Sequence, residues 1–135
     1  MNNAIIISIA LFLYFKYRKN NTNTDLWYSP SDDYSQILLV GTLPFENSVM
    51  LYKTQIMKAG QDNGIEAAII AGIIGVESKG QTNAVSEDNR HFGLMQIALA
   101  GARFVGYTGN AQGLLNPDTN IKYATKYLKY CIDQR

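Results

Sequence analysis

The segment from Ile65 to Ser78, "IEAAIIAGIIGVES", constrains the fold more than any other part of the chain. Isoleucine, alanine and valine occupy most of the circumference of a helix drawn over these residues, which is typical of a helix at the centre of a domain. Gly80 follows, where a glycine commonly closes a helix. A single carboxylate, Glu77, stands at the end of the apolar run. The sequence therefore predicts a central buried helix over residues 65–78 that carries one acidic side chain at its end.

Composition excludes several classes of function. Of the 135 residues, 47% are apolar and 17% are charged, which indicates a globular domain with room for an appendage. A net charge of +1 without a long basic run gives no basic surface that would bind nucleic acid, so no nucleic-acid partner is predicted. The single histidine, His91, and the single cysteine, Cys131, are too few for a conventional zinc site. No metal and no cofactor are predicted.

Residues 4–15, "AIIISIALFLYF", form an uncharged run that ends at a group of cations, Lys16, Arg18 and Lys19. Twelve helical residues rise about 18 Å, less than the roughly 30 Å hydrocarbon core. With Tyr17 included and the cations at the headgroups, residues 4–17 are predicted to form a single-pass membrane anchor. A helix on the membrane surface or in a protein core is the alternative. The cations after the segment favour a cytoplasmic position for the domain that comes next in the chain.

The chain is predicted to have three regions. Residues 1–19 are the predicted anchor, and residues 20–43 are a predicted linker or docking segment, because Asn, Ser, Asp and Pro are frequent there. Residues 44–135 are predicted to form one mainly α domain.

Helical signals dominate the predicted domain. Apolar residues between Val49 and Met57 recur at helical spacing, and Gly60 suits the position just after a helix. A polar loop is predicted over residues 80–92, a short hairpin within residues 80–97, and a helix from Leu94 to Val105. In the last helix Asn116 is the N-cap and Pro117 the first residue, with Asp118 in the first turn. Its predicted inward stripe consists of Ile121, Ala124, Thr125, Leu128, Cys131 and Ile132.

Glu77 is the first candidate for chemistry. A carboxyl group among aliphatic side chains loses hydration, which penalises its charged form and raises its pKa. A raised pKa suits a general acid near neutral pH. The alternative is an exposed glutamate on the last turn of a helix, which is common in proteins.

Other candidates lie in the loop and turn after this helix. In "HFGLMQI", Gly93 allows a close backbone approach, and Gln96 next to Met95 could hydrogen-bond a sugar or an amide; the alternative is a tight turn with Met95 in the core. Glu87 and Asp88 could supply a second carboxylate, or form a solvated acidic loop. His91 and Cys131 could form a thiol–imidazole dyad, but the position of Cys131 on an apolar stripe favours a core cysteine.

Four blocks in this order, "AAIIAGIIGVESKG", "NAVS", "FGLMQI" and "LLNPDTNIKYATKYL", resemble the soluble lytic transglycosylases and the related goose-type lysozymes over residues 65–130. The resemblance implies a lysozyme-like α fold that cleaves the β-1,4 bond between N-acetylmuramic acid and N-acetylglucosamine in peptidoglycan. It assigns the catalytic acid to Glu77, a helix-end context to Ser78 and Gly80, and the substrate groove to Gly93, Leu94, Met95 and Gln96. Asn116, Pro117, Asn120, Tyr127 and Leu128 match a mainly structural block.

The resemblance also bears on the reaction. Goose-type lysozymes position water with acidic residues before and just after G-L-M-Q; Glu87 falls near the first position and Ala98 occupies the second, which favours a 1,6-anhydro product over hydrolysis. The A-Y-N-x-G segment that normally follows the Y-L helix is absent from this sequence. Residues 20–43 are expected to replace part of that groove wall. A catalytically inactive muropeptide-binding or structural membrane protein is the alternative.

The predicted location is a membrane of the bacterial envelope. A bacteriophage virion with an internal membrane is a second prediction, because delivery during entry would reconcile the charge placement with access to the cell wall.

Overall fold

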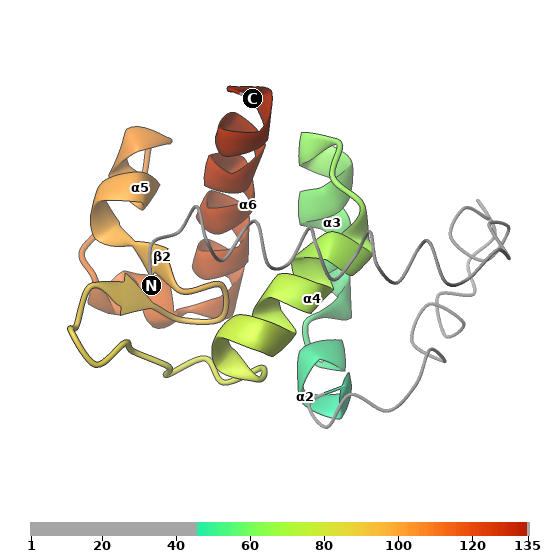
Figure 1. Cartoon of the computed structure of the whole chain (residues 1–135), viewed down its shortest axis with the longest axis horizontal. Helices are drawn as coiled ribbons and strands as arrows, with labels where there is room; N and C mark the ends of the chain where they lie inside the picture. The colour runs from blue at the N-terminus through green and yellow to red at the C-terminus, as the bar shows by residue number, and fades with distance from the viewer. Residues whose placement is uncertain (1–45, 135) are drawn as a thin grey trace, which may run out of the picture.

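The computed structural model describes residues 46–134 (Figure 1). In chain order the elements are α2 (Glu46–Met50), α3 (Lys53–Asn63), α4 (Ala67–Ser78), β1 (His91–Phe92), β2 (Ile97–Ala98), α5 (Leu99–Phe104), the 3-10 helix η3 (Gln112–Leu115) and α6 (Pro117–Asp133). The predicted anchor at residues 1–19 and linker at residues 20–43 lie outside the described residues. Within residues 46–134, no helix has the length and apolar character needed to cross a bilayer.

The described residues form a mainly α domain, as predicted. Helices α3 and α6 pack side by side, α4 packs on α3 and α2, and α5 packs on α6 (Figure 1). The core between them is aliphatic, and its largest fully buried apolar side chains are Ile70, Ile74, Leu94, Leu114 and Ile121. These residues come from α4, the segment after β1, η3 and α6, so one core joins the helices to the small hairpin.

Helix α3 ends later than the sequence pattern indicates. It continues through Gly60 to Asn63, and the left-handed residue after it is Gly64, with φ of 64°. Gly60 is buried within the helix, where a Cβ would lie 2.6 Å from the carbonyl oxygen of Ile65. The prediction that Gly60 follows the helix is therefore wrong: this glycine allows the next segment to cross the helix closely.

Helix α4 corresponds to the predicted central helix. Ile70, Ile73, Ile74, Gly75 and Ser78 face the core, whereas Val76 is 47% exposed. Every other residue of the helix is buried or half-buried, so the prediction of a central helix is confirmed except at this position. The helix stops after Ser78 because Lys79 and Gly80 both take left-handed conformations, with φ of 54° and 78°.

The predicted hairpin is confirmed. Strands β1 and β2 are antiparallel, with His91 opposite Ala98 and Phe92 opposite Ile97. The prediction of a helix from Leu94 is wrong in its first part, since α5 begins only at Leu99. The intervening turn contains Gly93 at φ of 72° and Gln96 at φ of 47°, values that a right-handed helix does not allow.

Helix α6 begins as predicted. The Asn116 side chain accepts a hydrogen bond from the backbone N–H of Thr119 at 3.1 Å, Pro117 opens the helix, and Asp118 lies in the first turn. The inward stripe is confirmed at its first four positions, Ile121, Ala124, Thr125 and Leu128, all buried. Cys131 and Ile132 are half-buried. A further polar residue, Asn120, is fully buried beside this stripe.

Candidate active site

Glu77 is the penultimate residue of α4, and its side chain is half-buried. The helical turn before it contributes Ile73 and Ile74, which are both buried. Loss of hydration raises the pKa of the Glu77 carboxyl from 4.5 to about 7. The ion pairs found among residues 46–134 leave Glu77 out, so no cation there offsets this effect. The carboxyl group is thus divided between its protonated and ionised forms near neutral pH.

Ser78 holds the end of this helix in shape. Its hydroxyl donates to the carbonyl of Ile74 at 3.1 Å and accepts from the backbone N–H of Gly80 at 3.2 Å. The side chain is 6% exposed. These contacts fit the helix-end context that the resemblance implies, and they fix the backbone directly after Glu77.

The segment after α4 folds back along β1. The backbone N–H of Ser86 donates to the carbonyl of His91, the N–H of Gly93 donates to the carbonyl of Ala84, and Val85 forms a bridge with Phe92. The chain leaving the Glu77 end of α4 is therefore attached to the hairpin. This attachment places residues 84–86 beside the turn that contains Gly93 and Gln96.

The side chain of Asn120 in α6 holds that turn through hydrogen bonds. Its Oδ1 accepts from the N–H of Met95 at 2.8 Å, and its Nδ2 donates to the carbonyls of Phe92 and Leu114, both at 2.7 Å. A Cβ on Gly93 would collide with the Asn120 amide and the Leu114 carbonyl. Gly93 is required here both for its left-handed conformation and for this close approach.

Gln96 has a fixed orientation at the end of the turn. Its Nε2 donates to the carbonyl of Ala84 at 3.0 Å and to the carbonyl of Gly93 at 2.9 Å. Both amide hydrogens are therefore used within the protein, and the side chain can offer a ligand only its carbonyl oxygen. Gln96 is half-buried, so this oxygen could accept a hydrogen bond from an N–H or O–H group.

Met95 points into the core. It is 8% exposed, and its sulfur accepts a weak hydrogen bond from the Thr125 hydroxyl at 3.8 Å. Of the two interpretations left open by the sequence, this placement agrees with a core residue that supports the turn. A direct contact of Met95 with substrate stays a prediction.

Glu87 and Asp88 lie at the exposed tip of the loop, in a turn closed by the bond from the N–H of Asn89 to the carbonyl of Ser86. The Ser86 hydroxyl donates to Asp88 at 2.6 Å, and this hydrogen bond is the main cause that lowers the Asp88 pKa. Asp88 is therefore an ionised group that shapes the turn. Glu87 is exposed, and its role towards a substrate stays a prediction.

His91 and Cys131 are not found in contact among the described residues. His91 has its Nδ1 3.9 Å from Asp88, whereas Cys131 lies beside the Tyr127 hydroxyl in the last turns of α6. The thiol–imidazole dyad therefore has no support in the geometry.

The structure thus joins Gly93, Gln96 and residues 84–86 into one loop cluster at the hairpin and fixes the Glu77 end of α4 through Ser78. The sequence places Asn120 only in a mainly structural block and does not predict that its side chain holds the turn. The available signal was a polar residue next to Ile121 at the start of an amphipathic helix. A surface groove of about 460 Å³ between α3 and α6 contains none of the predicted site residues.

Comparison with known proteins identifies the family. Residues 54–135 match the transglycosylase SLT domain family. Over 78 residues the chain is 38% identical to proteins named endo-type membrane-bound lytic murein transglycosylase A from Cronobacter sakazakii and from Enterobacter sp. (strain 638). Each match covers 53% of this chain and 38% of the relative, well under half of the relative's length. With α4, the hairpin and α6 all inside the matched region, the chain belongs to the transglycosylase SLT domain family.

Proposed function

We propose that this protein is a peptidoglycan lytic transglycosylase in which Glu77 is the catalytic acid and base. The observation that carries the proposal is the half-buried Glu77 carboxyl, whose pKa is raised to about 7 at the end of an apolar helix. Membership of the transglycosylase SLT domain family supports the substrate class. One group that is partly protonated at neutral pH can donate a proton in one step and accept one in the next.

In the first step, protonated Glu77 donates its proton to the oxygen of the β-1,4 bond between N-acetylmuramic acid and N-acetylglucosamine. The bond from C1 of the muramic ring to this oxygen breaks, and the glucosamine leaves as an alcohol. The acetamido group of the muramic acid stabilises the positive charge at C1, so the protein needs no nucleophile. Half-burial of Glu77 favours this step because it keeps the acid protonated near neutral pH.

In the second step, ionised Glu77 removes the proton from the C6 hydroxyl of the same muramic ring. The C6 oxygen attacks C1, which forms the 1,6-anhydro ring and returns Glu77 to its protonated state. We assign the carbonyl oxygen of Gln96 to accept a hydrogen bond from the substrate, since both its amide hydrogens are engaged within the loop cluster.

Hydrolysis is the second candidate reaction, and Glu87 is the residue that favours it. Glu87 lies exposed in the loop between α4 and β1 and could orient a water molecule. Goose-type lysozymes use a second acidic residue, just after G-L-M-Q, to position the water. In this chain Ala98 of β2 occupies that position and has no polar side chain. This asymmetry favours the 1,6-anhydro product.

The test is digestion of purified sacculi by the full chain, with mass spectrometry of the products. We expect 1,6-anhydro-muropeptides from the wild type and at least a hundredfold less product from Glu77→Gln, because an amide cannot exchange the proton. Glu66→Gln, at the other end of α4, is the matched control and should retain activity. If the wild type released muropeptides with reducing ends and Glu87→Gln did not, the protein would be a hydrolase. If the wild type released no product, a binding protein would be favoured.

The rate should also depend on pH in a defined direction. Because the first step needs protonated Glu77, we expect the catalytic rate to fall above about pH 7, where this carboxyl ionises. The rate of anhydro-muropeptide release between pH 5 and pH 9 is the measurement. A rate that rises through this range would contradict Glu77 as the acid.

We further propose that the protein acts at a membrane of the bacterial envelope, anchored through residues 4–17. The apolar run at residues 4–15 and the cations after it support this location. Two relatives are named as membrane-bound enzymes. A phage virion membrane is the narrower form of the same proposal, motivated by the predicted uncleaved anchor, the charge placement and the small size of the chain. Fractionation of host cells and of purified virions would distinguish the two.

A further inference from the structure

The outward side of α6 carries a repeated pair of residue types. The sequence "KYATKYLKY" places Lys122–Tyr123, Lys126–Tyr127 and Lys129–Tyr130 at intervals of four and three residues. This spacing keeps all six off the buried stripe that includes Ile121 and Leu128. Lys122, Lys126 and Tyr130 are exposed. Tyr123, Tyr127 and Lys129 are half-buried, and both of these tyrosines pack against the core. We refer to these six residues as the Lys–Tyr face.

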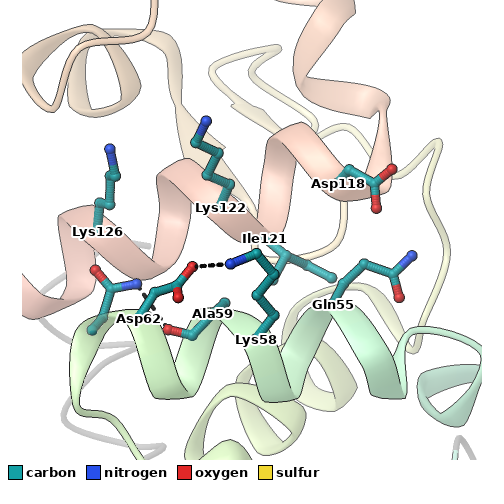
Figure 2. Close-up of a pocket in the computed structure, with 9 residues that line it drawn as sticks. Gln55, Lys58, Ala59, Asp62, Asp118, Ile121, Lys122 and Lys126 are labelled. Atoms are coloured by element: carbon teal, nitrogen blue, oxygen red, sulfur yellow. Dashed lines mark hydrogen bonds and ion pairs between the residues drawn. The ribbon is translucent and has the colours of Figure 1, made fainter.

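The cations of this face are only partly neutralised. Lys129 pairs with Asp133, whereas Lys122 and Lys126 are exposed and contact the Tyr123 ring, at 5.3 and 5.6 Å from its centroid. Lys122 and Lys126 line the groove between α3 and α6, and in the same groove Lys58 of α3 pairs with Asp62. Figure 2 shows Lys122 and Lys126 extending from α6 away from α3, not towards that pair. Two ammonium groups one helical turn apart are therefore directed outwards without a carboxylate partner among residues 46–134.

Aromatic side chains continue the face towards α5. Phe104, the last residue of α5, is 62% exposed, and its ring centroid lies 4.7 Å from that of Tyr130, which is 40% exposed. Arg103, next to Phe104, is also exposed. Phe104 and Tyr130 thus form an exposed aromatic pair next to the cations of the Lys–Tyr face.

The combination points to one kind of partner. We infer that the Lys–Tyr face, with Phe104, docks on an anionic lipid surface. Lysine ammonium groups pair with lipid phosphates, tyrosine rings are enriched at the depth of the headgroups, and phenylalanine can enter the acyl boundary. A sugar chain is less well matched, because stacking needs open ring faces, whereas Phe104 and Tyr130 tilt against each other by 56° and Tyr107 and Tyr123 by 58°.

The arrangement of the helices fits this docking. In Figure 1 the C-terminal end of α6 lies at the top of the view, and the end of α4, where Glu77 lies, is near the bottom. Tyr130, in the last turns of α6, therefore lies at the other end of the domain from the proposed catalytic group, and the face continues from there along α6 to Lys122. A short apolar segment such as residues 4–15 holds a membrane more firmly when a basic surface acts with it.

The experiment compares the full chain on phosphatidylcholine vesicles and on vesicles in which about three lipids in ten are phosphatidylglycerol. Lysine acetylation is followed residue by residue by mass spectrometry. We expect acetylation of Lys122 and Lys126 to slow about fivefold on the anionic vesicles alone, with Lys79 at the end of α4 as the internal reference. Equal rates on both vesicles, or protection by purified sacculi in place of vesicles, would overturn the proposal.

A second measurement tests the aromatic part without disturbing the fold. Phe104→Trp in a Trp27→Phe background should be quenched by brominated lipids in anionic vesicles, whereas Leu51→Trp in the same background, at a site 76% exposed between α2 and α3, should not. Equal quenching at both positions, or none at Phe104→Trp, would contradict the inference. Neither readout depends on peptidoglycan cleavage, so this proposal and the proposed enzymatic function can fail separately.

Discussion

Glu77 and Asp88 carry the same functional group eleven residues apart, but their surroundings move their pKa values in opposite directions. Burial at the end of α4 raises the pKa of Glu77 to about 7, whereas the hydrogen bond from the Ser86 hydroxyl lowers the pKa of Asp88. The two carboxyl groups therefore differ in protonation near neutral pH. The proton available at neutral pH therefore belongs to Glu77.

The raised pKa of Glu77 also predicts a change in stability with pH. A folded-state pKa of about 7 against 4.5 in the unfolded chain means that the folded protein binds the proton more tightly. The resulting stabilisation is complete below pH 4.5 and is lost as pH rises through 7. Because Gln stays neutral, we expect Glu77→Gln to gain roughly 1–2 kcal/mol over the wild type between pH 4 and pH 8, after allowance for partial exposure.

Urea unfolding of both proteins at pH 4 and pH 8 is the measurement, with Glu66→Gln as the reference for removal of a carboxyl from the other end of α4. A gap between Glu77→Gln and wild type that stays constant across this range would show that Glu77 is not desolvated in the fold.

At the scale of elements, the glycines of α3 and α4 have opposite roles. A Cβ at Gly60 would lie 2.6 Å from the Ile65 carbonyl, whereas a Cβ at Gly72 meets no described atom within 4 Å. We expect Gly60→Ala to lower the free energy of unfolding by about 1–3 kcal/mol through overpacking. Gly72→Ala should raise it by about 0.5–1 kcal/mol, because alanine favours the helix. Thermal unfolding of the two variants measures the difference, and equal effects would contradict this packing.

Sequence patterns predicted the elements whose signals are local. Helix α6 begins where Asn116, Pro117 and Asp118 indicated, and Glu77 was singled out because the apolar run before it lies in the same helix. Residues 94–96 of the turn do not form the helix that the sequence predicts from Leu94, because the bonds that hold the turn come from Asn120, twenty-five residues beyond Met95. The orientation of Gln96 could not be predicted either, since it depends on the Ala84 carbonyl in another segment.

At the scale of the whole molecule, Asn120 joins three parts of the domain. Its side chain binds β1 at Phe92, the end of η3 and the turn, while its backbone lies in α6. Asn120→Ala leaves one N–H and two carbonyls without this partner, so we expect a loss of about 3 kcal/mol in the free energy of unfolding. Asn116→Ala, which removes only the N-cap bond, should cost about 1 kcal/mol.

Chemical denaturation followed by circular dichroism tests this difference, with Asn116→Ala as the matched amide-to-alanine control. Equal losses for the two variants would show that the buried amide contributes no more than an ordinary helix cap.

The position of Asn120 also has a consequence for the order in which the protein matures on the ribosome. Helix α4 and the hairpin residues leave the exit tunnel well before residue 120, and at that stage the N–H of Met95 and the carbonyl of Phe92 have only water to bind. The turn bearing Gln96 reaches its final shape only after the first turns of α6 have emerged and docked. The turn of the hairpin is therefore completed late in synthesis, after the helix that carries Glu77.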